Sequence, residues 1–286
     1  MGFDMIKRTV RKIMRMFGMA NPNRGRSTQL DEVPRIACES ARLGFASRSQ
    51  VFGWFSSSEM SARWAAVEPE ILALELPELT GGVNQGDQRA LFSIVMALNP
   101  TNVLEIGTHI GCSTVHLAIA LRQLQSEGGC RALWTVDIRD VNDPTSRPWE
   151  AARSPASPRD LIARTNCRDI TSFHVSPSLD FLRRDQEEDF NLIFLDGLHD
   201  ASMVYREIPL ALKRLKPGGL ILLHDFFPDG LPLWKDQPAA AGPFQAVTRL
   251  QNEGAGLSVL PFGSLPWPTK LSTNITSLAL VTRQSE

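Results

Sequence analysis

The stretch that decides the fold is Val103-Leu-Glu-Ile-Gly-Thr-His-Ile-Gly-Cys-Ser113, in which an apolar run is followed by a glycine-containing turn and a helical segment. Gly107 lets the backbone turn sharply and a ligand approach closely, because a side chain there would block it. The two glycines are spaced G-x-x-x-G, so the G-x-G-x-x-G pattern of dinucleotide-binding folds is absent. The stretch predicts a buried strand, a ligand-binding turn and a helix.

Two acidic residues indicate what that turn binds. Glu105 directly precedes the turn, where it would repel a diphosphate and attract a positive charge or an amine. Asp137 ends the next apolar run, where a carboxylate can accept hydrogen bonds from both hydroxyls of a ribose. A nucleoside that carries an amine and no phosphate is S-adenosylmethionine.

Working outward, short apolar runs alternate with helical segments. This alternation predicts an α/β fold whose parallel sheet is covered on both faces. Strands are expected at 103–106, 133–138, 171–175, 192–195, 220–223, 257–261 and 277–282, and helices at 88–98, 113–125, 179–184, 201–215 and 244–252. Residues 139–159 are rich in Pro, Ser, Asp and Arg, and we expect a mobile insertion over the edge of the sheet.

Composition excludes several classes of protein. Of the 286 residues, 43% are hydrophobic and 21% are charged, the balance of a globular protein. Thirty basic against 31 acidic side chains give a net charge of −1, which disfavours a general nucleic-acid binder. The four cysteines form no C-x-x-C pair, so neither a zinc knuckle nor a disulfide framework is expected. Together with the absence of a spanning apolar run or a secretion signal, this predicts a cytoplasmic protein.

The first 80 residues are expected to form a helical extension or cap, and residues 81–286 the catalytic domain. Within the extension, residues 5–20 predict a basic amphipathic helix with Ile6, Val10, Ile13 and Phe17 on one face, and residues 21–28 a linker. That helix is expected to dock on the body or on a second copy in a homodimer. A membrane-surface helix and a cleaved targeting peptide are the alternatives.

Several motifs in order resemble known methyltransferases. Glu105-x-Gly107-x-x-x-Gly111-x-Ser113 followed by Asp137 resembles the cofactor site of class I S-adenosylmethionine-dependent methyltransferases. Gln85-Gly86 upstream is similar to the catechol and caffeoyl-CoA O-methyltransferase pattern. Downstream, Asp196-Gly-Leu-His199, Leu215-Lys-Pro-Gly-Gly219 and His224-Asp225 resemble the bacterial small-molecule O-methyltransferases. The resemblance covers residues 82–286.

The resemblance implies a Rossmann-like sheet of seven strands, mostly parallel, with a C-terminal antiparallel hairpin. It also implies that S-adenosylmethionine is held by Glu105, Gly107, Thr108, Gly111, Ser113, Asp137, Ser178 and Asp196. The simpler roles are a capping or solvated carboxylate for Glu105 and a helix-start residue for Ser113.

Asp196 and Asp225 are expected to end adjacent parallel strands, at the edge where open α/β folds bind ligands. Two carboxylates there either share a divalent cation such as Mg²⁺ or, without one, raise the pKa of one of the pair. The resemblance favours the metal, with Asp196 and Asp225 as ligands. Phe226 departs from it, because the related enzymes carry Asn or Asp there. Asp200 or His224 would have to substitute.

His199 is the candidate general base, since an imidazole can take a hydroxyl proton near neutral pH. The alternative is a structural histidine that holds its loop. His224 is expected to point the other way by strand alternation. Phe226, Phe227 and Trp234 follow Asp225 and are expected either to wall the acceptor pocket or to fill the core.

These observations predict an O-methyltransferase of a small molecule, a specialised metabolite or sugar hydroxyl, that uses S-adenosylmethionine with possible Mg²⁺ assistance. The alternatives are a metal-free small-molecule N-methyltransferase and a cofactor-binding relative with other chemistry. No nucleic-acid partner is expected.

Overall fold

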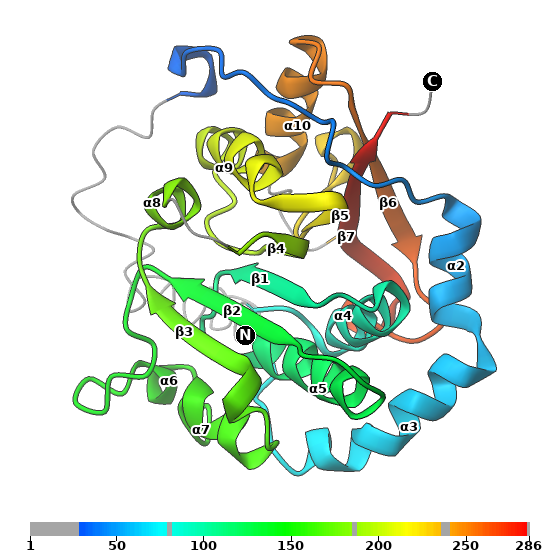
Figure 1. Cartoon of the computed structure of the whole chain (residues 1–286), viewed down its shortest axis with the longest axis vertical. Coiled ribbons are helices and arrows are strands. Elements are labelled where there is room, and N and C mark those ends of the chain that lie inside the picture. Colours follow the sequence, from blue (N-terminus) through cyan, green and yellow to red (C-terminus); the bar gives the residue numbers. More distant parts are fainter. Residues whose placement is uncertain (1–28, 79–81, 185–187, 236–240, 285–286) are drawn as a thin grey trace, which may run out of the picture.

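The computed structural model describes residues 29–78, 82–184, 188–235 and 241–284. The amphipathic helix and linker predicted at 5–28 lie outside these residues. Among them runs a seven-stranded sheet of order β3-β2-β1-β4-β5-β7-β6 (Figure 1). The strands β1 to β5 are parallel, and β7 pairs antiparallel with β5 and β6. The predicted fold class is therefore confirmed, including the C-terminal hairpin.

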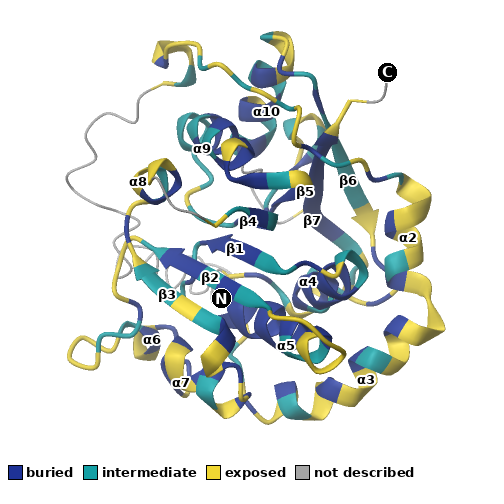
Figure 2. Ribbon diagram, viewed as in Figure 1, coloured by how far each residue is buried: buried dark blue, intermediate teal, exposed yellow. Residues whose placement is uncertain are grey.

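The strands are close to the predicted runs. Their bounds are β1 Asn102–Ile106, β2 Ala132–Asp137, β3 Thr171–Val175, β4 Phe190–Leu195, β5 Leu215–Leu223, β6 Leu257–Ser264 and β7 Ile275–Arg283. Successive side chains of a strand point to opposite faces, and here both faces are apolar. In β1, for example, Val103 belongs to the hydrophobic cluster on one face and Leu104 to the cluster on the other. Figure 2 shows the central strands buried beneath both helical layers.

Two layers of helices cover the sheet. One layer contains α2, α3, α4, α5 and α7, and the other contains α8, α9 and α10. Their bounds are α2 Arg48–Ser56, α3 Ser58–Leu72, α4 Gln85–Leu98, α5 Cys112–Ser126, α7 Pro158–Arg164, α8 Ser178–Arg183, α9 Ala201–Lys213 and α10 Gly242–Asn252. Within the described residues, no helix is long and apolar enough to cross a membrane.

The described part of the N-terminal extension packs into the same core. Phe55 of α2 and Trp64 of α3 lie in the hydrophobic cluster with α4 and α5, and Trp64 meets Phe92 edge-on at 5.4 Å between ring centroids. Before α2, the Gly44 amide donates to the carbonyl of Gly219. A Cβ on Gly44 would lie 2.4 Å from the Gly218 carbonyl oxygen, so only glycine fits this close approach.

The segment 139–159, which the sequence led us to expect as a mobile insertion over the edge of the sheet, contains regular and buried structure. It contains the short helix α6 (Pro148–Ala151), and Trp149 is buried in a small cluster with Ile110 and Cys112. Ile110 and Cys112 belong to the glycine turn and to the start of α5. The segment therefore packs against the turn that the sequence singled out.

Candidate active site

Glu105 lies at the end of β1 and is fully buried. Its Oε2 accepts hydrogen bonds from the hydroxyls of Thr114 and Thr135, both at 2.6 Å, whereas Oε1 has no partner. Burial raises its pKa to about 7, against the opposing effect of the neighbouring hydroxyls of Ser113, Thr114 and Thr135. A buried carboxylate with one unpaired oxygen suits a cationic ligand group.

A second hydroxyl continues this network beneath the turn. Thr108 Oγ1 lies 2.6 Å from Thr135 Oγ1, and both side chains are buried. Thr108 was a predicted cofactor residue, but its side chain points into the protein and supports Thr135. Thr135 was missed by the sequence analysis. The sequence does contain a hint of its role, because Thr135 places a hydroxyl within the apolar run 133–136.

Both glycines of the turn have positive φ angles, +103° at Gly107 and +83° at Gly111. A Cβ on Gly107 would lie 2.2 Å from the carbonyl oxygen of Asp196, and one on Gly111 would lie 2.9 Å from Pro158 Cβ. We expected Gly107 to allow both a sharp backbone turn and the close approach of a ligand, and the positive φ angle agrees with the first of these roles. In the structure it is needed for its backbone angle and for the close packing of the ends of β1 and β4.

Asp137, at the end of β2, is held by backbone amides. Its Oδ2 accepts from the His109 amide in the glycine turn at 2.9 Å, and its Oδ1 accepts from the Arg139 amide at 3.0 Å. The carboxylate is therefore fixed beside the turn. Ser178, in contrast, directs its hydroxyl at Glu207 of α9, 2.5 Å away, and so toward the helix layer.

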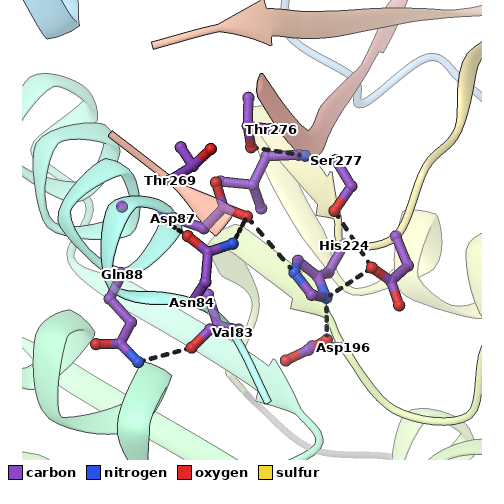
Figure 3. A network of polar contacts seen from close by, with 12 residues as sticks. Val83, Asn84, Asp87, Gln88, Asp196, His224, Thr269, Thr276 and Ser277 are labelled. Carbon is purple, nitrogen blue, oxygen red and sulfur yellow. Dashed lines mark hydrogen bonds and ion pairs between the residues drawn. The ribbon is translucent and has the colours of Figure 1, made fainter. Parts of the chain in front are cut away.

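On the other side of the same sheet edge, four ionisable side chains converge. Asp196 follows β4 and its Oδ1 lies 3.6 Å from His199 Nε2 and 2.8 Å from His224 Nδ1. Asp225 follows β5, with Oδ2 3.6 Å from His199 Nε2 and Oδ1 3.6 Å from His224 Nδ1. Figure 3 shows His224 between Asp196 and the carboxylate that accepts from Ser277. The predicted convergence of Asp196, His199 and Asp225 is what the structure has.

The expectation that His224 points away is wrong. Strand alternation applies only while the backbone stays extended, and β5 ends at Leu223. Asp225 has a φ of +51°, in the left-handed region, which is uncommon for a residue other than glycine. This turn lets two consecutive side chains, His224 and Asp225, face the same site.

The charges of this cluster compensate one another. Burial alone would lower the pKa of His224, but the carboxylates of Asp196 and Asp225 raise it well above its usual value. Burial likewise opposes ionisation of Asp225, but His224 and His199 lower the pKa of that carboxyl. His224 Nδ1 makes no aligned hydrogen bond, so its contact with Asp196 is an ion pair. The cluster is a buried arrangement of imidazole and carboxylate groups.

Phe226, Phe227 and Trp234 are all buried, which favours the core-filling alternative over a pocket wall. Phe226 packs near Phe244, and Phe227 meets Trp234 edge-on. A groove of about 920 Å³ instead opens beside His199. Most of the residues that line it have polar side chains, among them Asp31, Ser202, Gln245, Thr248 and Arg249, although apolar atoms make up slightly more than half of its surface.

Residues 104–226, which contain both halves of this site, match the family model of a methyltransferase domain. This chain carries a methyltransferase domain. The resemblance to methyltransferases drawn from the sequence motifs is thereby confirmed over these residues. No curated protein matches the chain in sequence.

Solved structures share the fold of this methyltransferase. A putative O-methyltransferase from Klebsiella pneumoniae is 19% identical, with a TM-score of 0.51 over 80% of this chain and 91% of that one. TomG from Streptomyces achromogenes, an O-methyltransferase of tomaymycin synthesis in complex with SAM, is 20% identical, with a TM-score of 0.51 over 80% and 91%. An O-methyltransferase from Bacillus cereus in complex with SAH is 20% identical, with a TM-score of 0.51 over 79% and 92%.

The donor atoms of this methyltransferase do not fit the Mg²⁺ site that the resemblance implies. Magnesium prefers an octahedron of oxygen ligands. Among the described residues, the donor atoms that all lie within 4.8 Å of one another are those of Asp196, His199 and His224, one oxygen and two imidazole nitrogens. Asp225, the second predicted ligand, lies 3.6 Å from each imidazole but falls outside that group. That set is typical of zinc or iron rather than magnesium. At the position of the third oxygen ligand stands Phe226, and Asp200 caps α9 through the Ser202 and Met203 amides.

Proposed function

We propose that this methyltransferase transfers a methyl group from S-adenosylmethionine to a hydroxyl group of a small molecule. The observation that carries the proposal is the position of His199, whose Nε2 lies 3.6 Å from carboxylate oxygens of both Asp196 and Asp225. A histidine so placed can accept a proton while the flanking carboxylates stabilise the imidazolium that forms.

Glu105, the glycine turn at 107–111 and Asp137 form the cofactor half of the site, and they support S-adenosylmethionine as the methyl donor. The unpaired Oε1 of Glu105 can accept from a ligand ammonium, and Asp137 lies beside the turn where ribose hydroxyls bind in related folds. When bound, S-adenosylmethionine supplies a methyl group activated on a sulfonium. The structures of TomG with SAM and of the Bacillus cereus enzyme with SAH give further support.

The acceptor hydroxyl would be deprotonated by His199 as its oxygen attacks the methyl carbon. The oxygen–carbon bond forms, the carbon–sulfur bond breaks, and the electron pair of that bond stays on sulfur. The hydroxyl proton goes to the imidazole of His199. The acceptor oxygen must lie in line with the carbon–sulfur bond that breaks. The site that binds the acceptor contributes this alignment. In this proposal the step uses no Mg²⁺, because the donor atoms of Asp196, His199 and His224 do not form an oxygen-ligand site.

The groove beside His199 supports a polar acceptor. Hydroxyl and amide groups on α9 and α10, those of Ser202, Gln245, Thr248 and Asn252, can hydrogen-bond a polyhydroxylated molecule, and Phe244 adds one aromatic face. A sugar or a glycosylated metabolite fits this lining better than a wholly apolar ring system.

The test is an assay of the purified protein with S-adenosylmethionine and a panel of glycosides, phenols and amines. Mass spectrometry should find a product heavier by one CH₂ group among the hydroxylated acceptors, together with S-adenosylhomocysteine. Methylation confined to amines would favour the N-methyltransferase alternative. Failure of S-adenosylmethionine to bind in calorimetry would overturn the proposal.

A further inference from the structure

Asp87 is a buried carboxylate that no sequence motif explains. It lies in the first turn of α4 with no exposed surface. Its Oδ2 accepts from Asn84 Nδ2 at 2.7 Å and lies 3.8 Å from Nε2 of His224, whereas its Oδ1 has no partner. A buried charge is costly unless it is paired, and here the amide of Asn84 and the nearby cationic groups of His224 and Lys270 offset that cost.

His224 connects Asp87 to the acceptor half of the site, which consists of Asp196, His199, His224 and Asp225. Its two ring nitrogens lie on opposite edges, Nε2 toward Asp87 and Nδ1 toward Asp196 (Figure 3). The same Asp196 oxygen that lies 2.8 Å from His224 lies 3.6 Å from His199 Nε2. A continuous line of ionic contacts therefore runs from Asp87 through His224 and Asp196 to His199.

The start of α4 is a fixed support for this line. The carbonyl of Gly86 accepts from Trp267 Nε1 at 2.9 Å, and a Cβ on Gly86 would lie 2.4 Å from the carbonyl oxygen of Pro268. In the same turn, Gln88 Nε2 donates to the carbonyl of Val83 at 2.7 Å. Asp87 thus stands on a helix end that is locked against the β6–β7 hairpin.

We propose that Asp87 is a positioning residue for methyl transfer, which acts by holding the imidazole of His224 so that Nδ1 faces Asp196. This inference rests on the proposed function. Without the carboxylate at position 87, the ring loses the partner of one edge and is free to turn away from Asp196. Asp196 and His199 would then lose their alignment with the acceptor.

The test compares Asp87→Asn, which keeps the shape of the side chain, with His224→Asn and the double variant. We expect Asp87→Asn to lower kcat about 10- to 100-fold, the scale on which small misplacements act, with the KM for S-adenosylmethionine unchanged. Because Asp87 acts only through His224, the double variant should be no slower than His224→Asn. The matched control is Glu70→Gln, which removes the charge of a carboxylate paired with Arg122 in a different part of the fold.

Two further measurements keep the inference testable. Asn84→Ser retains a capping oxygen for α4 but removes the amide that holds Asp87, and should lower kcat in the same direction by a smaller factor. A crystal structure of Asp87→Asn should show the His224 ring displaced from Asp196, a result that does not depend on which acceptor is methylated. Additive losses in the double variant, an unchanged kcat, or an unmoved ring would overturn the inference. Failure of the proposed function would instead appear in the wild type, as a lack of methyl transfer.

Discussion

The two halves of the site differ in how their charged side chains are paired. The cofactor half surrounds one carboxylate, Glu105, with neutral hydroxyls from Ser113, Thr114 and Thr135, and leaves an oxygen unpaired. The acceptor half places two imidazoles among carboxylates, so its charges compensate one another without a ligand.

This difference assigns different tasks to the two halves. A buried carboxylate that lacks a cation is completed by a ligand that brings one, which suits binding. A cluster whose carboxylates are already balanced by a buried imidazolium, His224, is suited to moving a proton with little rearrangement. Substitutions in the acceptor half should therefore affect turnover, and substitutions in the cofactor half should affect affinity.

The largest effect is expected for His199→Ala. Loss of a general base should lower kcat by about 10²- to 10⁴-fold near neutral pH, with the affinity for S-adenosylmethionine nearly unchanged. The residual rate should rise at higher pH, where the acceptor ionises without help. Steady-state kinetics with calorimetry as the folding and binding control checks this. A well-folded variant with near-normal kcat across the pH range would show that His199 is a structural residue.

A smaller effect, on affinity rather than turnover, is expected for Asp137→Ala. Loss of charge-assisted hydrogen bonds to the ribose should weaken binding by about 1 to 3 kcal/mol. Because Asp137 also accepts from the His109 amide, thermal unfolding of the variant must accompany the calorimetry. Binding as tight as that of the wild type would contradict the assignment.

What the sequence could predict depended on regular backbone. The parallel strands are short apolar runs because both faces are buried, and their carboxyl ends meet at one edge. Asp196, His199 and Asp225 could therefore be brought together from the sequence alone. The cofactor half could be predicted for a second reason. Glu105, the glycine turn and Asp137 lie within one strand–helix–strand unit, so their proximity follows from local structure.

The missed features depend on irregular backbone or distant packing. The direction of His224 follows from one positive φ angle at Asp225, which strand alternation does not anticipate. Asp87 reaches the site from α4, far along the chain from Asp196, and only the packed structure brings them together. The aromatic residues after Asp225 carry no periodicity, so neither the pocket nor the core could be preferred.

A still smaller effect, on pH dependence, distinguishes the cofactor half. The pKa of Glu105 is raised to about 7 in the free protein, so the carboxyl holds a proton below that pH. An ammonium ligand requires the charged form, so affinity should rise by roughly 25-fold between pH 5.5 and 7.5 and then level off. Glu105→Gln should bind more weakly at neutral pH and lose this dependence. An equal pH dependence in both proteins would assign it to another group.

The same group has the opposite effect on the stability of the free protein. Since its folded pKa is raised above the unfolded value, the folded state holds more protons between about pH 4.5 and 7. Its contribution to stability is present below that window and is lost as the pH rises through 7. Thermal unfolding of the free protein at pH 5.5 and 8 should therefore show a larger loss in the wild type than in Glu105→Gln.

The smallest effect is expected from a chelator. The converging donors are one carboxylate oxygen and two imidazole nitrogens, and Phe226 supplies no third oxygen, so the acceptor half is not built for Mg²⁺. We expect excess EDTA to change kcat by less than about twofold, since the proposed proton transfer uses only His199 and its flanking carboxylates. Metal analysis of the purified protein should accompany the assay, because a tightly held zinc or iron would resist a brief exposure. Loss of activity in EDTA that Mg²⁺ restores would show that magnesium completes the acceptor half. In that case both halves would need a bound cation to balance their carboxylates, and the contrast between the cofactor half and the acceptor half would be wrong.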